Sequence, residues 1–140
     1  MNRTISKFMV DTVIGIAITC GANAQTKVGD NKDGGIVYWI DANGTHGLIA
    51  DAQDLGKFPW EDAKDRCRQK GAGWRLPSKD ELNKLYLNKD KVGGFTSVLY
   101  WSSDEYITPG LQAWFQNFRT GVQYYIFKVG SETVRAVRDF

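Results

Sequence analysis

The chain has 140 residues, about the length of one domain. Its formal net charge is +2, so charge gives no support for a protein that binds nucleic acid or an acidic surface. Hydrophobic residues make up 42% and aromatic residues 13% of the chain, enough for one packed core.

The first 24 residues differ in composition from the rest of the chain. Two basic residues give them a positive start, residues 8–19 form an apolar run, and a small-x-small pattern precedes Gln25. This order is typical of a secretory signal peptide, and the run is shorter than the roughly 20 residues that span a bilayer. We therefore predict a signal peptide over residues 1–24, cleaved before Gln25.

Two residues keep other interpretations of this segment open. Asp11 interrupts the apolar run, which is also consistent with an N-terminal membrane anchor or with a poor signal that leaves the chain in the cytosol. Cys20 is consistent with lipid attachment. Cleavage before Gln25 would remove two basic residues and Asp11, lowering the net charge from +2 to +1. Cys67 would then be the single cysteine, so no intrachain disulfide could form. The signal peptide also predicts export to the cell surface, the periplasm or the medium.

The segment after the signal peptide begins with turn-forming and polar residues. Residues 25–33 are predicted as a polar leader ahead of the domain. Residues 35–41 and 46–51 are predicted as the two strands of a hairpin, with Gly44 in the turn between them. Residues 52–59 are predicted as a loop.

A first helix is predicted over residues 60–70. Trp60, Ala63 and Cys67 recur at helical spacing in an otherwise charged segment, which is typical of an amphipathic helix. On this helix Cys67 is a small core residue; the alternative is a reactive thiol.

A second helix is predicted to begin at Ser78. Ser78 and Glu81 have the spacing of a capping box, and Pro77 blocks an earlier start. Trp74 and Leu76 are expected to bury beside this helix.

The last third of the chain alternates strand-like runs with turns. The runs cover residues 99–105, 111–118, 122–128 and 132–140. We predict one α+β domain over residues 34–140, with two helices early and an antiparallel sheet late.

Residues 124–127 break the alternation of a half-buried strand, because four large apolar residues follow one another. Either both faces of this strand are covered, or the strand displays aromatic side chains to a ligand.

Four ordered motifs point to a family. They are GWRLPSKDEL (73–82), YWSSDEY (100–106), AWFQNF (113–118) and VRAVRDF (134–140). In this order and spacing they resemble the C-type lectin-like domains of the bacterial collagen-like adhesin C-terminal (Lcl C-terminal) family. The resemblance implies a C-type lectin-like fold, with two helices packed on a small twisted antiparallel sheet and the chain ends close together. It also implies a binding module on an exported or surface protein.

The same motifs also predict how some of their side chains pack and pair. Trp101 and Trp114, on consecutive strands, are expected to fill the middle of the domain. Arg135 and Arg138, three residues apart, are expected to pair with Glu105 or Asp104.

Some proteins of this fold are the variable proteins of diversity-generating retroelements, in which adenines of the final coding segment are randomised. The residue types that such randomisation of an AAC codon produces occur at 107–111, 119, 122, 124–127 and 129–131, whereas Gln123 and Lys128 would be fixed. The resemblance therefore implies a hypervariable surface here; the alternative is an ordinary strand covered on both faces.

The leading functional hypothesis is a receptor-like or adhesin module that binds a protein or glycan on another cell. Stiff aromatic side chains with a polar tip dominate recognition surfaces. The candidate ligand-binding residues are Tyr106, Ile107, Thr108, Pro109, Leu111, Arg119, Val122, Tyr124, Tyr125, Ile126, Phe127 and Val129.

Catalysis and cofactors are not expected. His46 is the only histidine and Cys67 has no cysteine partner, so neither a nucleophile–base pair nor a zinc site has its residues. Residues 107–112 contain no acid, so calcium is not expected either. Two alternatives stay open: a glycosaminoglycan-binding adhesin domain using Lys84, Lys89 and Lys91, and a purely structural envelope protein.

Overall fold

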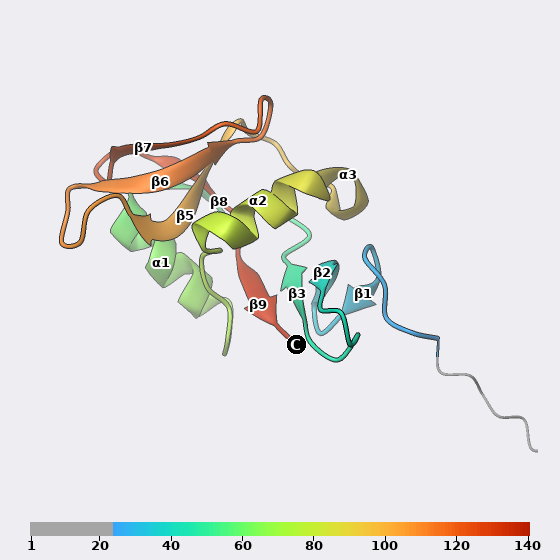
Figure 1. The fold of residues 1–140 in the computed structure, drawn as a ribbon. Helices are drawn as coiled ribbons and strands as arrows, with labels where there is room; N and C mark the ends of the chain where they lie inside the picture. The colour runs from blue at the N-terminus through green and yellow to red at the C-terminus, as the bar shows by residue number, and fades with distance from the viewer. Residues whose placement is uncertain (1–23) are drawn as a thin grey trace, which may run out of the picture.

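The computed structural model describes residues 24–140 as two β-sheets and three helices (Figure 1). The first sheet has the strand order β1-β2-β3-β9, formed by Asn31–Lys32, Gly35–Ile40, Gly47–Ala50 and Val137–Asp139. The second has the order β4-β8-β5-β6-β7, formed by Gly56–Phe58, Glu132–Val134, Leu99–Glu105, Gln112–Asn117 and Gln123–Phe127. The helices are α1 (Trp60–Gln69), α2 (Lys79–Leu87) and α3 (Lys89–Val92). Residues 1–23 of the predicted signal peptide lie outside the described part of the chain.

The α+β class and the two longer helices are confirmed, and so is the hairpin, as β2 and β3. The loop predicted over residues 52–59 is wrong in part, because Gly56–Phe58 form β4 and pair with β8. The run 132–140 divides between the sheets: β8 pairs in parallel with β5, and β9 pairs antiparallel with β3. β1 lies within the segment predicted as the polar leader.

The first sheet brings the ends of the domain together. Phe140 exchanges two backbone hydrogen bonds of 3.1 Å with Gly47, beside β9. Lys32 of β1 places its ammonium 4.9 Å from the centre of the Phe140 ring. The two ends of the domain are therefore close, as expected.

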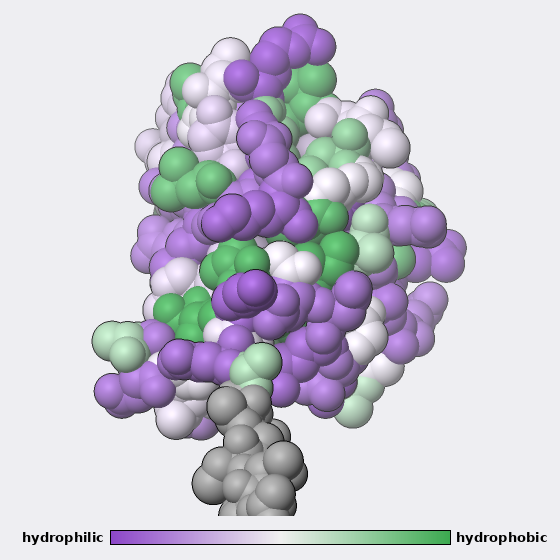
Figure 2. Space-filling view, turned by 90° about the vertical axis from the view of Figure 1, so that its right-hand side faces the viewer, coloured by the Kyte–Doolittle hydropathy of each residue, from purple (hydrophilic) through white to green (hydrophobic). Residues whose placement is uncertain are grey.

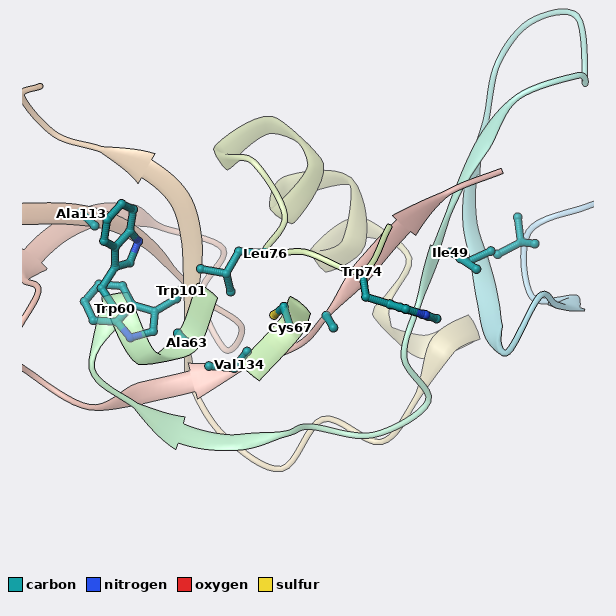
Figure 3. Packing of buried hydrophobic residues seen from close by; sticks show 11 residues of the cluster. Ile49, Trp60, Ala63, Cys67, Trp74, Leu76, Trp101, Ala113 and Val134 are labelled. Carbon is teal, nitrogen blue, oxygen red and sulfur yellow. The ribbon is translucent and has the colours of Figure 1, made fainter. Parts of the chain in front are cut away.

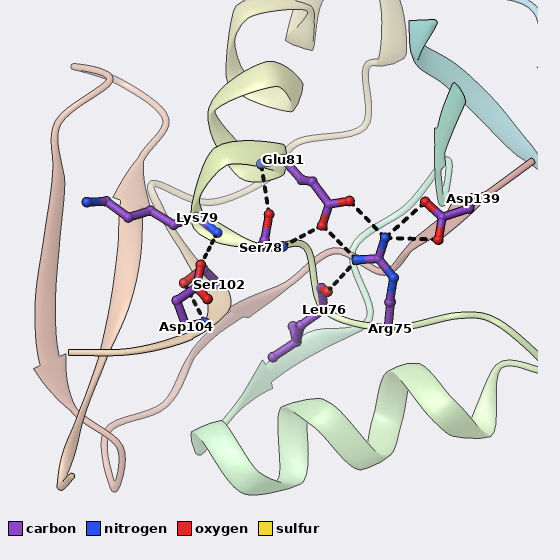
Figure 4. Close-up of polar contacts among 8 residues, drawn as sticks. All are labelled: Arg75, Leu76, Ser78, Lys79, Glu81, Ser102, Asp104 and Asp139. Atoms are coloured by element: carbon purple, nitrogen blue, oxygen red, sulfur yellow. Dashed lines mark hydrogen bonds and ion pairs between the residues drawn. The ribbon is translucent and has the colours of Figure 1, made fainter. Parts of the chain in front are cut away.

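α2 begins at the predicted capping box and is held to both sheets (Figure 4). The Ser78 hydroxyl accepts from the Glu81 N–H at 3.1 Å, and the Glu81 carboxylate accepts from the Ser78 N–H at 2.8 Å. Arg75 donates to both oxygens of Glu81, at 2.7 and 2.8 Å, and also to Asp139 of the first sheet. Asp104 of β5 accepts from the Lys79 N–H at 2.6 Å. These bonds set the position of the helix N-terminus between the sheets.

Two clusters of buried side chains form the core. One joins α1 to both sheets and contains Trp60, Cys67 and Trp101 (Figure 3). The other lies under α2 and contains Leu82 and Leu85. Burial raises the pKa of the Cys67 thiol to about 12, which favours the core role of this residue over the reactive one.

Two packing expectations need correction. Trp74 and Leu76 are buried, but in the cluster of α1 rather than beside α2. Arg135 pairs with neither Glu105 nor Asp104. Its buried guanidinium donates from Nε to Asp54 at 2.8 Å, in the loop that follows the first hairpin.

The surface is uneven in its apolar content. On the face shown in Figure 2, hydrophilic residues divide the apolar ones into small separate spots. The exposed large hydrophobic residues of the described chain, apart from Leu87 on α2, lie between residues 106 and 129. No helix within residues 24–140 has the length and apolar character needed to cross a membrane.

Candidate binding surface

The register of β6 and β7 determines which side chains reach the surface. Ala113 lies opposite Ile126, and Trp114 lies opposite Tyr125. Opposed residues share a face of a sheet, and neighbours along a strand alternate. Ala113 is fully buried and Ile126 packs against the core, so this pair faces inward. Trp114 and Tyr125 therefore project from the opposite face.

An aromatic cluster covers this outward face. The ring of Tyr106 stacks on that of Tyr125, with centroids 3.6 Å apart and planes within 16°. Tyr124 lies at an inward-facing strand position opposite Phe115, but it is exposed at the sheet edge and its ring stacks on that of Tyr125 at 4.4 Å and 16°. Trp114 meets Tyr106 and Tyr125 edge-on, at 5.9 and 5.4 Å. We call Tyr106, Trp114, Tyr124 and Tyr125 the aromatic face.

Polar contacts hold the aromatic face in place. The ammonium of Lys79, at the start of α2, lies 3.6 Å from the centre of the Trp114 ring, a cation–π distance. Hydrogen bonds with Tyr106 and Tyr124 raise the pKa of Tyr125, so the phenol of Tyr125 stays neutral at physiological pH. The aromatic face is therefore rigid, apolar over its rings and polar at its hydroxyl tips.

A pocket of about 270 Å³ adjoins the aromatic face. Its lining comes from the β5–β6 loop and the end of β7: Tyr106, Ile107, Pro109, Gly110, Leu111, Gln112 and Phe127. Much of this lining is apolar and exposed, with Leu111 78% and Ile107 63% accessible. The pocket could therefore receive an apolar group of a ligand.

The loop that lines the pocket is held at its base. Glu105 accepts from the Gly110 N–H at 3.0 Å and pairs with the ammonium of Lys128 at 3.0 Å. The hydrogen bond from Lys128 is the main cause that lowers the pKa of the Glu105 carboxyl. The Tyr106 N–H donates to Gln112 across the loop at 2.9 Å. The lining side chains thus project from an ordered main chain.

The sequence of residues 26–138 matches the model of the Lcl C-terminal domain family. The chain belongs to this family. No curated protein matches its sequence.

Solved structures show the fold of this Lcl C-terminal domain. A chain of the complex between a von Willebrand factor A1 domain mutant and botrocetin matches with a TM-score of 0.51 at 11% identity, covering 79% of this chain and 100% of that one. A structure of botrocetin matches with a TM-score of 0.49 at 13% identity, covering 78% and 98%. The Lcl C-terminal domain has the C-type lectin-like fold, as expected.

The structure places the predicted binding residues in four environments. Tyr106, Ile107, Pro109, Leu111 and Phe127 line the pocket, with Thr108 exposed beside them. Tyr124 and Tyr125 belong to the aromatic face, and Val129 is exposed just beyond β7. Arg119 and Val122 are exposed near the turn between β6 and β7, at the other end of the strand. Ile126 is half-buried and turned to the core, so its side chain is not available to a ligand.

Two residues of this surface were missed. Trp114 was expected in the middle of the domain but is half-exposed on the aromatic face, and Lys79 was not considered. Alternation along β6 predicts that Trp114 points outward, because its neighbours Ala113 and Phe115 both pack in the core.

The alternative sites find less support. The ammonium of Lys84 lies over the Trp39 ring, and that of Lys89 donates to the Phe118 carbonyl, so the predicted lysine cluster does not converge on one point. Among the described residues, no group of three His, Cys, Asp or Glu could hold a metal ion.

Proposed function

We propose that this Lcl C-terminal domain is an exported ligand-binding module of the adhesin or receptor-like kind. Its aromatic face and the adjoining pocket would contact a protein or a glycan on another cell or surface. The observation that carries the proposal is the stack of Tyr106, Tyr125 and Tyr124, which presents a large rigid area at low entropic cost. Botrocetin, of similar fold, is found in complex with a von Willebrand factor A1 domain, which supports a protein ligand.

The test is a screen of the purified protein against immobilised glycans and extracellular proteins. For a ligand found there, Tyr106→Ala should weaken binding roughly tenfold or more, because it removes one end of the stack and part of the pocket wall. Leu87→Ala is the matched control, since Leu87 is 69% exposed on α2. Equal binding by both variants would contradict the proposed site. Loss of folding in Tyr106→Ala would instead indicate a structural role.

The same surface suits diversification by a retroelement. Ile107, Leu111 and Phe127 are exposed, and they are among the positions that randomised adenines would change. Deep sequencing of the last 120 or so bases of the gene across its source population tests this. We expect variation restricted to adenine-derived codons, with a near-copy repeat of the segment in the neighbouring DNA. An invariant segment without such a repeat would contradict diversification.

A further inference from the structure

The two sheets have four edge strands, and three of them carry features that prevent pairing with another chain. β1 has two residues, one of them Lys32. β9 has three and contains Arg138 and Asp139. β4 has three, with Lys57 exposed and Pro59 following. Short length, charge and proline are the usual protections of sheet edges.

β7 lacks all of these protections. It has five residues, Gln123–Phe127, with no charge and no proline, and it lies at the outer edge of the second sheet (Figure 1). Tyr124 and Phe127 are 55% and 56% exposed, and Val122, next to the strand, is 59% exposed. Within residues 24–140 no strand pairs with this edge.

The hydrogen bonds of the β6–β7 pair show which groups this edge presents. Asn117 N–H donates to Val122 C=O and Lys128 N–H donates to Leu111 C=O. In an antiparallel pair hydrogen-bonded positions alternate, so Tyr124 and Ile126 bond to β6 while Gln123, Tyr125 and Phe127 point their N–H and C=O groups away from the sheet. Of these outward groups, the Phe127 carbonyl already accepts from Gly130.

We propose that β7 pairs with β7 of a second copy of this chain. The outward groups are symmetric about Tyr125, which is what an antiparallel pair related by a two-fold axis requires. Tyr125 of each copy would exchange two hydrogen bonds with Tyr125 of the other. Each Phe127 N–H would donate to the Gln123 carbonyl opposite, giving two more bonds.

The lack of charge on β7 favours a second copy of this chain as the partner that pairs with the strand edge. No charged residue lies between Thr120 and Lys128, and the ammonium of Lys128 is already paired with Glu105 of its own chain at 3.0 Å. Two identical strands can therefore approach without like-charge repulsion. The exposed Tyr124 of one copy would lie opposite Ile126 of the other and gain an apolar neighbour.

The pairing joins the two second sheets into one continuous sheet. Its two-fold axis is perpendicular to the sheet, so both aromatic faces lie on the same side. Two ligand sites would then act together on a multivalent surface, which raises the overall avidity. The dimer itself does not depend on the proposed function, since it uses the strand edge rather than the outward face.

The test is sedimentation equilibrium of the purified protein from 10 µM to 1 mM, with hydrogen exchange at both ends of that range. One pair of five-residue strands is a small interface, so we expect a weak dimer, with Kd on the order of 0.1 mM. The amides of Tyr125 and Phe127 should gain protection at the higher concentration, whereas those of Tyr124 and Ile126 should not change. A monomer at 1 mM, or a dimer that leaves these two amides exposed, would overturn the proposal.

Matched variants separate the backbone from the side chain. Phe127→Pro and Phe127→Ala both lose the ring, but only the proline also removes the outward N–H, without removing a β6–β7 bond. We expect Phe127→Ala to remain a weak dimer and Phe127→Pro to be monomeric throughout. Equal association of the two, with native circular dichroism in both, would count against strand pairing.

Discussion

Trp101 and Trp114 lie 13 positions apart on neighbouring strands, and the register gives them opposite roles. Trp101 is 1% exposed and donates from Nε1 to the Phe58 carbonyl at 2.8 Å, whereas Trp114 lies on the aromatic face. Truncation of a buried large side chain leaves a cavity, and a half-exposed site leaves less of one.

We therefore expect Trp101→Ala to lower the free energy of unfolding by about 3–5 kcal/mol. Trp114→Ala should lower it by about 1 kcal/mol. Urea denaturation followed by circular dichroism measures both. Equal losses would mean that Trp114 belongs to the core after all.

Cys67 allows a chemical check at the same scale. Its thiol is fully buried on α1 and its pKa is raised to about 12, so the thiolate is scarce below pH 9 and no reagent reaches it. A thiol reagent that colours on reaction should label Cys67 of the mature chain only after denaturant is added. Rapid labelling of the native protein would contradict the buried assignment.

At the scale of elements, the cap of α2 makes stability depend on pH. Burial raises the pKa of Glu81, but hydrogen bonds from Arg75 and Ser78 outweigh it, so the pKa lies below its ordinary range. A lowered folded pKa adds stability that is complete above the unfolded pKa, near 4.3, and is lost as pH falls through the folded pKa.

We expect Glu81→Gln to cost roughly 1–2 kcal/mol at pH 7, because it weakens both the cap and the bonds with Arg75. The cost should shrink as the pH falls below the unfolded pKa and through the lowered folded pKa, where Glu81 of the wild type becomes protonated. Thermal unfolding of both proteins from pH 3 to 7 is the measurement. Parallel pH curves would show that Glu81 is not the titrating group.

Local sequence patterns were enough to predict most helices and strands. They were not enough to predict which strands pair with one another. The helices at Trp60 and Ser78 could be predicted because their apolar spacing and capping box are local. β4 could not, since three residues with Lys57 in the middle carry no pattern of their own. Nor could the division of residues 132–140, because strand-like patterns are the same whichever sheet a strand joins.

The candidate surface was predictable to a similar degree. Ile107 and Leu111, which were named as candidate ligand-binding residues, are exposed in the β5–β6 loop. All four residues of the run 124–127 were named as ligand-binding candidates, but they do not share one face. Ile126 faces the core, while Tyr125 faces outward with Trp114. Only the pairing with β6 decides this, and pairing is a tertiary property.

At the scale of the whole molecule, Arg135 connects distant parts of the chain. Its buried guanidinium donates to Asp54 at 2.8 Å and to the carbonyls of Asp51 and Gly93 at 2.9 and 3.0 Å. Removal of one partner of a buried ion pair leaves the other charge without compensation.

Arg135→Met should therefore lower the free energy of unfolding by about 3–5 kcal/mol, leaving Asp54 buried without its counter-charge. Arg119→Met, at an exposed position, should change it by less than about 0.5 kcal/mol. Urea denaturation at pH 7 compares them. A small effect of Arg135→Met would mean that water replaces its three contacts.

The tyrosine stack also gives the molecule a spectroscopic signature. Rings held nearly parallel at 3.6 and 4.4 Å have coupled electronic transitions, so they should give a distinct band in the near-ultraviolet circular dichroism. A ligand that separates or reorients the rings would alter that band. The domain therefore carries its own optical reporter at the surface where we place its ligand, and no dye needs to be attached to observe binding.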